Sequence, residues 1–181
     1  MVILSTDRLA LLALKEHVIT DPQNLLEANW STSSSVFDWV GVNCGSRFRR
    51  FTALNLFGTI PSHFGNISFL ASLNIGNNSF CGSLPIELAK LRRMKSVRLT
   101  DNNFDGEIPT WFSSFTQLQD LFMHGNNFTG VIPSSLCSLS KIENLLLAKN
   151  NLEGQIPEAI GNLSSLSASL LEYNQLSGFI R

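Results

Sequence analysis

The side chains most able to do chemistry in this sequence are three histidines and three cysteines, and they are widely spaced. The histidines are His17, His63 and His124. No Cys-His-Asp group, no metal-ligand spacing of cysteine and histidine, and no Gly-X-Ser-X-Gly turn occurs among them. His124 falls at an outward strand position and is interpreted as a surface group. The sequence therefore predicts no catalytic site, no bound metal and no cofactor.

The cysteines cannot all pair with one another. They are Cys44, Cys81 and Cys137, and three is an odd number. At least one thiol is therefore free or bonds outside the chain.

Composition and charge exclude several classes of function. The 181 residues carry 13 basic and 14 acidic side chains. A net charge near zero argues against a nucleic-acid-binding protein and against a polybasic membrane-surface protein. The basic run KLRRMKSVR, residues 90–98, is interpreted as a solvated face. No apolar run reaches the ~18–20 residues of a membrane span.

The N-terminal stretch predicts an amphipathic helix rather than a signal peptide. Charged residues interrupt its apolar run, and no basic segment precedes it. A hydroxyl or carboxylate at residues 5–7 can cap the helix. We expect it to end at Asp21-Pro22. Its inner side is expected to comprise Leu9, Leu12, Ala13 and Val18.

A repeat of 24 residues organises the rest of the chain. Gly-X-(Ile/Leu)-Pro begins at Gly82, Gly106, Gly130 and Gly154. Asparagine recurs with the same step at Asn78, Asn102, Asn126, Asn150 and Asn174. Apolar residues separated by one position, such as Leu73 and Ile75, point to one face of a short strand, and stacked strands form a parallel sheet with a continuous core. Five asparagines in register favour an inward ladder that satisfies backbone groups of the turns over solvent-exposed turn residues.

This pattern, LxxLxxLxLxxNxLxGxIP, resembles the plant-type extracellular leucine-rich repeat over residues 67–181. The segments TDRLALLALKEHV, Asn29-Trp30 and DWVGVNC resemble the N-terminal cap of plant receptor-like kinases with such ectodomains. The resemblance implies an α/β repeat solenoid that is right-handed and curved, with a parallel sheet on its concave face and a helical cap. It implies a cap at residues 1–48 and an array at 49–181. The array divides into a shortened repeat at 49–66, repeats at 67–90, 91–114, 115–138 and 139–162, and an incomplete repeat at 163–181.

Three positions depart from the family pattern. The family's cap carries two cysteines, but position 37 is phenylalanine, so Cys44 is expected to be unpaired. Repeat one, with Leu54 and Leu56 expected as its strand pair, reaches its glycine five residues early. In the last repeat Ser169 takes the inward strand position and Leu170 the outward one. Either a hydroxyl is buried there or the strand slips by one residue. These departures suggest a truncated or divergent relative of a larger receptor.

Five Asn-X-Ser/Thr sequences are candidate glycosylation sites, although a chain rich in asparagine and serine produces some by chance. They begin at Asn29, Asn66, Asn77, Asn127 and Asn162. Asn66 and Asn162 share a Gly-Asn-X-Ser context, four repeats apart, and are the preferred candidates.

The outward residues of the sheet are the predicted binding surface, because successive repeats bring them together. Phe122, Leu146 and Leu170 recur at one position and form an apolar stripe of the kind found at binding hot spots, although single outward apolar residues are common. The predicted ligand-binding residues are Arg98, Asp101, Asp120, Phe122, His124, Leu146, Leu170 and Tyr173.

The resemblance implies a non-enzymatic recognition module, similar to the ectodomain of an immune or developmental receptor-like kinase, outside the cell or at its surface. Its expected partner is a peptide, a microbial molecule or a partner receptor ectodomain. Two alternatives stay open: a secreted inhibitor of a cell-wall-degrading hydrolase, and a gene fragment without independent function.

Overall fold

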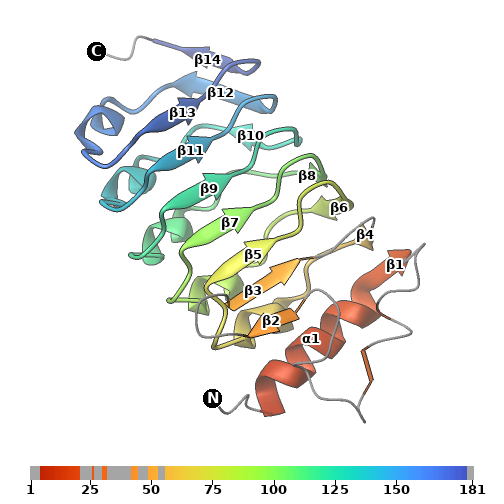
Figure 1. Ribbon diagram of the computed structural model, residues 1–181. Coiled ribbons are helices and arrows are strands. Elements are labelled where there is room, and N and C mark those ends of the chain that lie inside the picture. The colour runs from red at the N-terminus through yellow and green to blue at the C-terminus, as the bar shows by residue number, and fades with distance from the viewer. Residues whose placement is uncertain are drawn as a thin grey trace.

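The computed structural model describes residues 5–20, 26, 30–31, 42–44, 49–52 and 56–178. In this part, one N-terminal helix is followed by a stack of similar coils (Figure 1). Each complete coil contributes a strand to one large sheet, then a short second strand, and then a 3-10 helix. The coil is therefore the unit that positions every outward side chain.

The large sheet has the strand order β13-β11-β9-β7-β5-β3-β2. The bounds are β2 Val42–Cys44, β3 Arg49–Thr52, β5 Ser72–Asn74, β7 Ser96–Arg98, β9 Asp120–Phe122, β11 Asn144–Leu146 and β13 Ala168–Leu170. From β3 to β13 every neighbouring pair is parallel. β2 is antiparallel to β3, an addition that the repeat did not predict. The predicted repeat solenoid with a parallel sheet is confirmed.

Two smaller sheets and a row of 3-10 helices complete the coils. β1 Val18–Thr20, β4 Phe57–Gly58, β6 Ser79–Gly82 and β8 Asn103–Phe104 form one small sheet, and β10 Thr129–Gly130, β12 Asn151–Gln155 and β14 Gln175–Ser177 form the other. The 3-10 helices are η2 Ser62–Asn66, η3 Ile86–Lys90, η4 Thr110–Ser114, η5 Ser134–Ser138 and η6 Glu158–Asn162.

Glycine and proline make the bends between these elements. The repeat glycines at 82, 106, 130 and 154 have φ between +72° and +78°, where a side chain would strain the backbone. A proline with φ between −57° and −74° precedes each 3-10 helix, where its missing N–H is not needed.

The core is a continuous apolar column enclosed by the coils. Phe80, Phe104 and Phe128 stack along its length, with ring centroids 6.2 and 6.3 Å apart. All three side chains are fully buried. Because each ring contacts the ring of the next coil, the core links neighbouring repeats directly.

The N-terminal helix, α1 Ser5–His17, packs on η2 through a face that only partly matches the predicted one. Of the predicted inner residues, Leu12 and Val18 pack partly buried against the core, whereas Leu9 is 63% exposed. The fully buried side chains are those of Ala10, Leu11 and Leu14, so packing against η2 shifts the centre of the inner face away from Leu9. The predicted end at Asp21-Pro22 is also wrong: the helix ends at His17, and β1 continues the chain by pairing antiparallel with β4.

Repeat one lacks fewer residues than the five that the position of its glycine predicts. Its strand is β3, in which Phe51 pairs with Leu73, so the predicted strand at Leu54 and Leu56 is wrong. Leu56 is buried and its carbonyl accepts from the Ser79 N–H, as the Phe104 carbonyl accepts from the Asn127 N–H. Leu56 therefore occupies the position of the stacked phenylalanines. Residues 53–55, including Leu54, lie outside the described part of the chain.

The last repeat keeps its register and buries a hydroxyl. Leu145 pairs with Ser169 and Leu146 with Leu170, so the strand does not slip. The Ser169 hydroxyl oxygen is buried without a hydrogen-bond partner, and Leu170 is 45% exposed. Of the two alternatives, the buried hydroxyl is the one observed.

Replacing Ser169 with leucine should stabilise the chain by about 1–2 kcal/mol. The substitution removes an unsatisfied buried hydroxyl and adds apolar side chain at an inward position that is leucine in neighbouring repeats. Urea unfolding measures the gain, and Ser164→Leu, at an exposed position of the same repeat, is the control and should give none. A lower midpoint for Ser169→Leu would mean that the end of the core has no room for the side chain.

Candidate functional site: the outward face of the sheet

Strand pairing aligns one row of outward side chains across the sheet. Asn74 pairs with Arg98, Arg98 with Phe122, Phe122 with Leu146, and Leu146 with Leu170. Arg98, Phe122 and Leu146 are half-buried and Leu170 is exposed. The row therefore places one cation beside a stripe of three apolar side chains.

Arg98 lies flat against its neighbour on the next strand. Its guanidinium carbon is 4.2 Å from the centroid of the Phe122 ring. Such a cation–π contact contributes about 0.5–1 kcal/mol at an exposed site and more where water is excluded. In the described part of the chain, no hydrogen-bond acceptor or carboxylate pairs with Arg98. The ring thus holds the guanidinium in place and leaves its N–H groups available.

The carboxylate of Asp120 is hydrogen-bonded on the side of β9 that faces β11, away from Arg98. Its Oδ1 accepts a hydrogen bond of 2.7 Å from the Asn144 side chain on β11, whereas Arg98 is on β7. One strand position earlier, the Gln119 side chain donates to Glu143 at 3.0 Å. These bonds order the carboxylates next to the row without neutralising Arg98.

Asp101 and Tyr173 lie in a second row, at the turn that follows each strand. Their φ angles are +53° and +57°, and Lys149 at the equivalent position has +54°. Left-handed backbone is unfavourable for such residues by about 1–2 kcal/mol each. In repeat four the position is Gly125, on which a Cβ would collide with the Asp101 carboxylate. Tyr173 is 74% exposed, with the Lys149 ammonium 6.0 Å from its ring centroid.

His124 differs from the free surface group that the sequence predicts. The side chain is half-buried, and its Nδ1 is buried without a hydrogen-bond partner. Its backbone carbonyl accepts from the Asp101 N–H at 3.0 Å. His124 therefore lies between the strand row, which contains Phe122, and the turn row, which contains Gly125, with its ring partly covered.

The ladder asparagines lie inside the coils and bind each coil to the one before. The Asn126 side-chain nitrogen donates to the carbonyls of Met123, His124 and Leu99, and its oxygen accepts from the Phe104 N–H. Asn102, Asn150 and Asn174 make the equivalent set of bonds. Asn78 accepts from the Leu56 N–H at 2.7 Å and donates to the carbonyls of Ile75 and Gly76.

The candidate glycosylation residues separate into two groups. Asn66 and Asn162 are exposed and end η2 and η6, respectively. Asn77 and Asn127 are exposed at the turns after the sheet strands, and Asn77 has a φ of +56°. Asn29 lies outside the described residues.

The two cysteines with described side chains are free thiols. Cys81 donates to the Gly58 carbonyl at 3.6 Å. Burial raises the pKa of the Cys137 thiol, which disfavours the reactive thiolate form. The side chain of Cys44 and residue 37 lie outside the described part, so the expected state of Cys44 remains a prediction.

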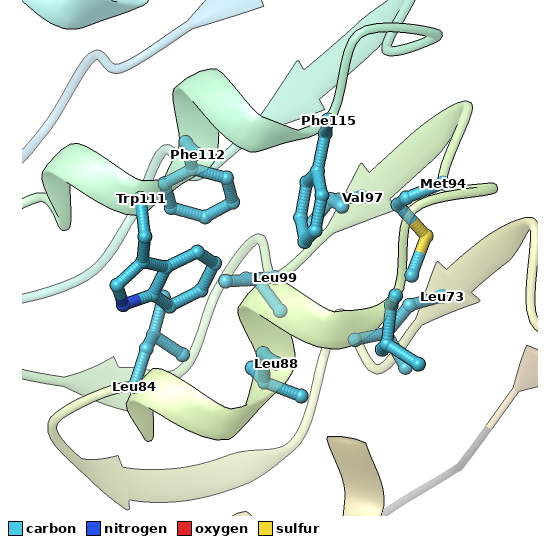
Figure 2. Close-up of a pocket in the computed structure, with 10 residues that line it drawn as sticks. Leu73, Leu84, Leu88, Met94, Val97, Leu99, Trp111, Phe112 and Phe115 are labelled. Atoms are coloured by element: carbon cyan, nitrogen blue, oxygen red, sulfur yellow. The ribbon is translucent and has the colours of Figure 1, made fainter. Parts of the chain in front are cut away.

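A small cavity inside repeats two and three is too small and too apolar to be a ligand site. Its volume is about 10 Å³, and every lining side chain is apolar (Figure 2). Val97 lines it at the inward strand position, which is leucine at Leu73 and Leu121. The smaller side chain explains the space, which suits one water-sized group at most.

Among the described residues, no group of three or more histidine, cysteine, aspartate or glutamate side chains could hold a metal ion. The same part of the chain contains no helix with the length and apolarity needed to cross a membrane.

Known families match the chain from the cap through the repeats. The family described as "Leucine rich repeat N-terminal domain" matches residues 4–45, and families described as "Leucine rich repeat" match residues 69–91 and 92–152. The crystal structure of the BIR2 ectodomain from Arabidopsis thaliana is 30% identical, over 95% of this chain and 94% of that one, with a TM-score of 0.82. The chain belongs to the leucine-rich-repeat family of plant receptor ectodomains.

Other members of this leucine-rich-repeat family are much longer. The LRR receptor-like serine/threonine-protein kinase EFR of Arabidopsis thaliana is 41% identical over 80 residues, which is 41% of this chain and 8% of the kinase. The Arabidopsis receptor kinase HAESA, solved in complex with the peptide hormone IDA and the co-receptor SERK1, is 31% identical with a TM-score of 0.85. That match covers 96% of this chain and 30% of HAESA.

Sequence reasoning did not find two features of this leucine-rich-repeat surface. The stacking of Arg98 on Phe122 depends on side-chain conformation, which residue spacing does not specify. The sequence did contain a signal for the left-handed backbone at Asp101, Lys149 and Tyr173. Asparagine and glycine favour this conformation, and they occupy the equivalent positions in two other repeats, at Asn77 and Gly125.

Proposed function

We propose that this leucine-rich-repeat chain is a non-enzymatic recognition module that binds a peptide, a microbial molecule or a partner receptor ectodomain on the outward face of its sheet. The observation that supports this most is the aligned row of Arg98, Phe122, Leu146 and Leu170. A partly exposed apolar stripe beside a cation is typical of binding hot spots, in which arginine and aromatic residues are enriched.

A solved structure of another family member also supports this proposal. HAESA was solved with a peptide hormone and a co-receptor bound, which shows that an ectodomain of this family accepts both kinds of partner. This likeness supports our proposal that the chain acts outside the cell or at its surface, in signalling of the immune or developmental type.

Two matched serine substitutions test the use of the sheet face. Leu170 on β13 and Ile86 on η3 are both exposed, at 45% and 69%, so neither change should disturb folding. The probes are a displayed library of random dodecapeptides and the SERK1 ectodomain, with the chain immobilised. Leu170→Ser should weaken binding of the retained probe about tenfold or more, and Ile86→Ser less than twofold. Equal effects of the two, or no retained probe, would contradict the proposal.

Secretion should place glycans at Asn66 and Asn162. Both asparagines end a 3-10 helix, are exposed, and lie away from the sheet strands. Mass spectrometry of peptides from the chain secreted by plant cells should find both sites occupied, and Asn66→Gln and Asn162→Gln should each remove one glycan. An unmodified Asn66 and Asn162 in secreted protein would contradict this prediction.

A further inference from the structure

We infer that a second binding surface lies on the turn row, and that its ligand is an extended, neutral oligosaccharide of linked pyranose rings. The turn row has one residue from each coil, at the turn that follows the sheet strand: Asn77, Asp101, Gly125, Lys149 and Tyr173. The inference goes beyond the proposed function, because it assigns a different surface and a different class of ligand from those of the strand row.

The backbone of the turn row is the first argument. Lys149 and Tyr173 have φ angles of +54° and +57°, in the left-handed region that glycine and asparagine favour. Gly125 and Asn77 make the same turn with less strain, so the turn itself requires neither a lysine nor a tyrosine. Both side chains are exposed, Tyr173 to 74%, so neither contributes to the core. A strained residue whose side chain lies outside the core indicates a role on the surface.

The side chains of the turn row present separate polar and aromatic groups. The Asp101 carboxylate lies over Gly125, in the space that a side chain at that position would need. The Lys149 ammonium is 6.0 Å from the centroid of the Tyr173 ring. In the described part of the chain, no hydrogen bond or ion pair occupies the carboxylate, the ammonium or the tyrosine hydroxyl. The row therefore offers an acceptor, a donor and an exposed ring along three successive coils.

A pyranose ring fits these groups. Its C–H face stacks on an exposed aromatic ring, and its hydroxyls both donate and accept, so they bind a carboxylate and an ammonium equally well. Two residues further along each coil, exposed amides without a hydrogen bond in the described part of the chain follow: Asn103, Asn127, Asn151 and Gln175. None of these side chains is aliphatic, so a peptide would bury little apolar surface here.

The charges along the turn row favour a neutral ligand. From two residues before to four residues after each turn-row position, and besides the half-buried His124, the charged side chains are four exposed carboxylates and one exposed ammonium: Asp101, Asp105, Glu153, Glu172 and Lys149. Arg98, just outside these segments, is stacked on Phe122 in the strand row. Acidic groups therefore outnumber basic ones, and an anionic ligand such as a uronate would be repelled.

The spacing of the coils fits an extended glycan. Neighbouring strands are about 4.8 Å apart, and successive turn-row positions follow the same spacing. One pyranose ring of a β-1,4-linked chain spans about the same length, so each coil can face one ring. Gly125, which the Asp101 carboxylate covers, and Tyr173 are two coils apart. A ligand that reaches both therefore needs about three rings, over roughly 10 Å.

An NMR titration of the isotope-labelled chain tests the inference. The protein is made in bacteria, so that Asn77 and Asn127 carry no glycan. The probes are the β-1,4-linked hexasaccharides of glucose, N-acetylglucosamine, xylose and mannose. At least one should give saturable shifts of the backbone amides of Gly125, Lys149 and Tyr173. Maltohexaose, whose α-linkages curve the chain, should bind about tenfold more weakly or worse, and anionic hexagalacturonate should not bind.

Matched variants locate the oligosaccharide. Tyr173→Asn should weaken the retained hexasaccharide about tenfold or more without lowering the urea midpoint, because asparagine suits the left-handed turn. Ile86→Ser removes a side chain of similar exposure from η3 and should change the affinity less than twofold. Lys149→Asn should weaken binding about threefold or more. Its control, Lys141→Asn, removes an exposed ammonium before β11 and should change the affinity less than twofold.

The outcomes separate this inference from the proposed function. Binding of none of the hexasaccharides would overturn the turn-row site, as would equal losses within either matched pair, and the sheet face would be unaffected. Equal binding of maltohexaose would overturn the match to the coils, and tighter binding of hexagalacturonate would overturn the neutral ligand. If Tyr173→Asn abolished capture of the selected dodecapeptide while no hexasaccharide bound, the turn row would be a peptide surface and the glycan would be ruled out.

Discussion

Phe104→Ala should lower the free energy of unfolding by about 3–5 kcal/mol. The side chain is completely buried and stacks between Phe80 and Phe128, with interplanar angles of 5° and 15°. Alanine would leave a void in the middle of the array, where coils on both sides lose contacts at once. Urea unfolding followed by far-UV circular dichroism measures the change.

Phe104→Leu is the matched control. Leucine already occupies the equivalent position at Leu152, and by its hydrogen bonding Leu56 is in that position as well. The control should therefore cost only about 1 kcal/mol. If the alanine and leucine variants unfolded at the same urea concentration, the stack would not be the structural link between coils.

Asn126→Ala should cost about 2–3 kcal/mol, the second largest effect expected. The substitution leaves the Phe104 N–H and the carbonyls of Leu99 and Met123 without their side-chain partner, all at a position that is 7% exposed. An unsatisfied buried polar group costs about 1–3 kcal/mol, and only part of the loss can be recovered by water in so closed a turn. The measurement is again the urea midpoint.

Asn127→Ala controls for the general effect of replacing an asparagine in this turn. The Asn127 side chain is exposed, and its backbone N–H bond to Phe104 does not depend on the side chain. Its free energy of unfolding should change by less than about 0.5 kcal/mol. Both variants should be made in bacteria, so that no glycan at Asn127 contributes. Equal midpoints would contradict a ladder that binds the coils together.

The repeat itself made most of the fold predictable. A 24-residue period in glycine, proline and leucine determines the coil, and the alternation around Leu121 determines which side chains face inward. The same frame placed Phe122, Leu146 and Leu170 in one row, because a parallel sheet preserves register from coil to coil.

The parts that were mispredicted lie where the period fails. In repeat one no neighbouring frame constrained the assignment, and apolar alternation alone favoured Leu54 and Leu56 over the polar segment that forms β3. In α1 the spacing placed Leu12 and Val18 correctly against the core but not Leu9, because the contact with η2 sets which side of the helix is most deeply buried. At Ser169 the frame correctly located the residue, but whether a hydroxyl would be buried or the strand would slip depended on energies that spacing does not contain.

The asparagine bonds give the array a direction. Asn126 reaches back to Phe104 and Leu99, and Asn150 reaches back to Phe128 and Met123 in the same way. A backbone N–H of each coil therefore finds its acceptor on the asparagine of the coil that the ribosome makes after it. During translation the chain can close in the order of its synthesis, with one unfinished coil at the growing end however long the array becomes.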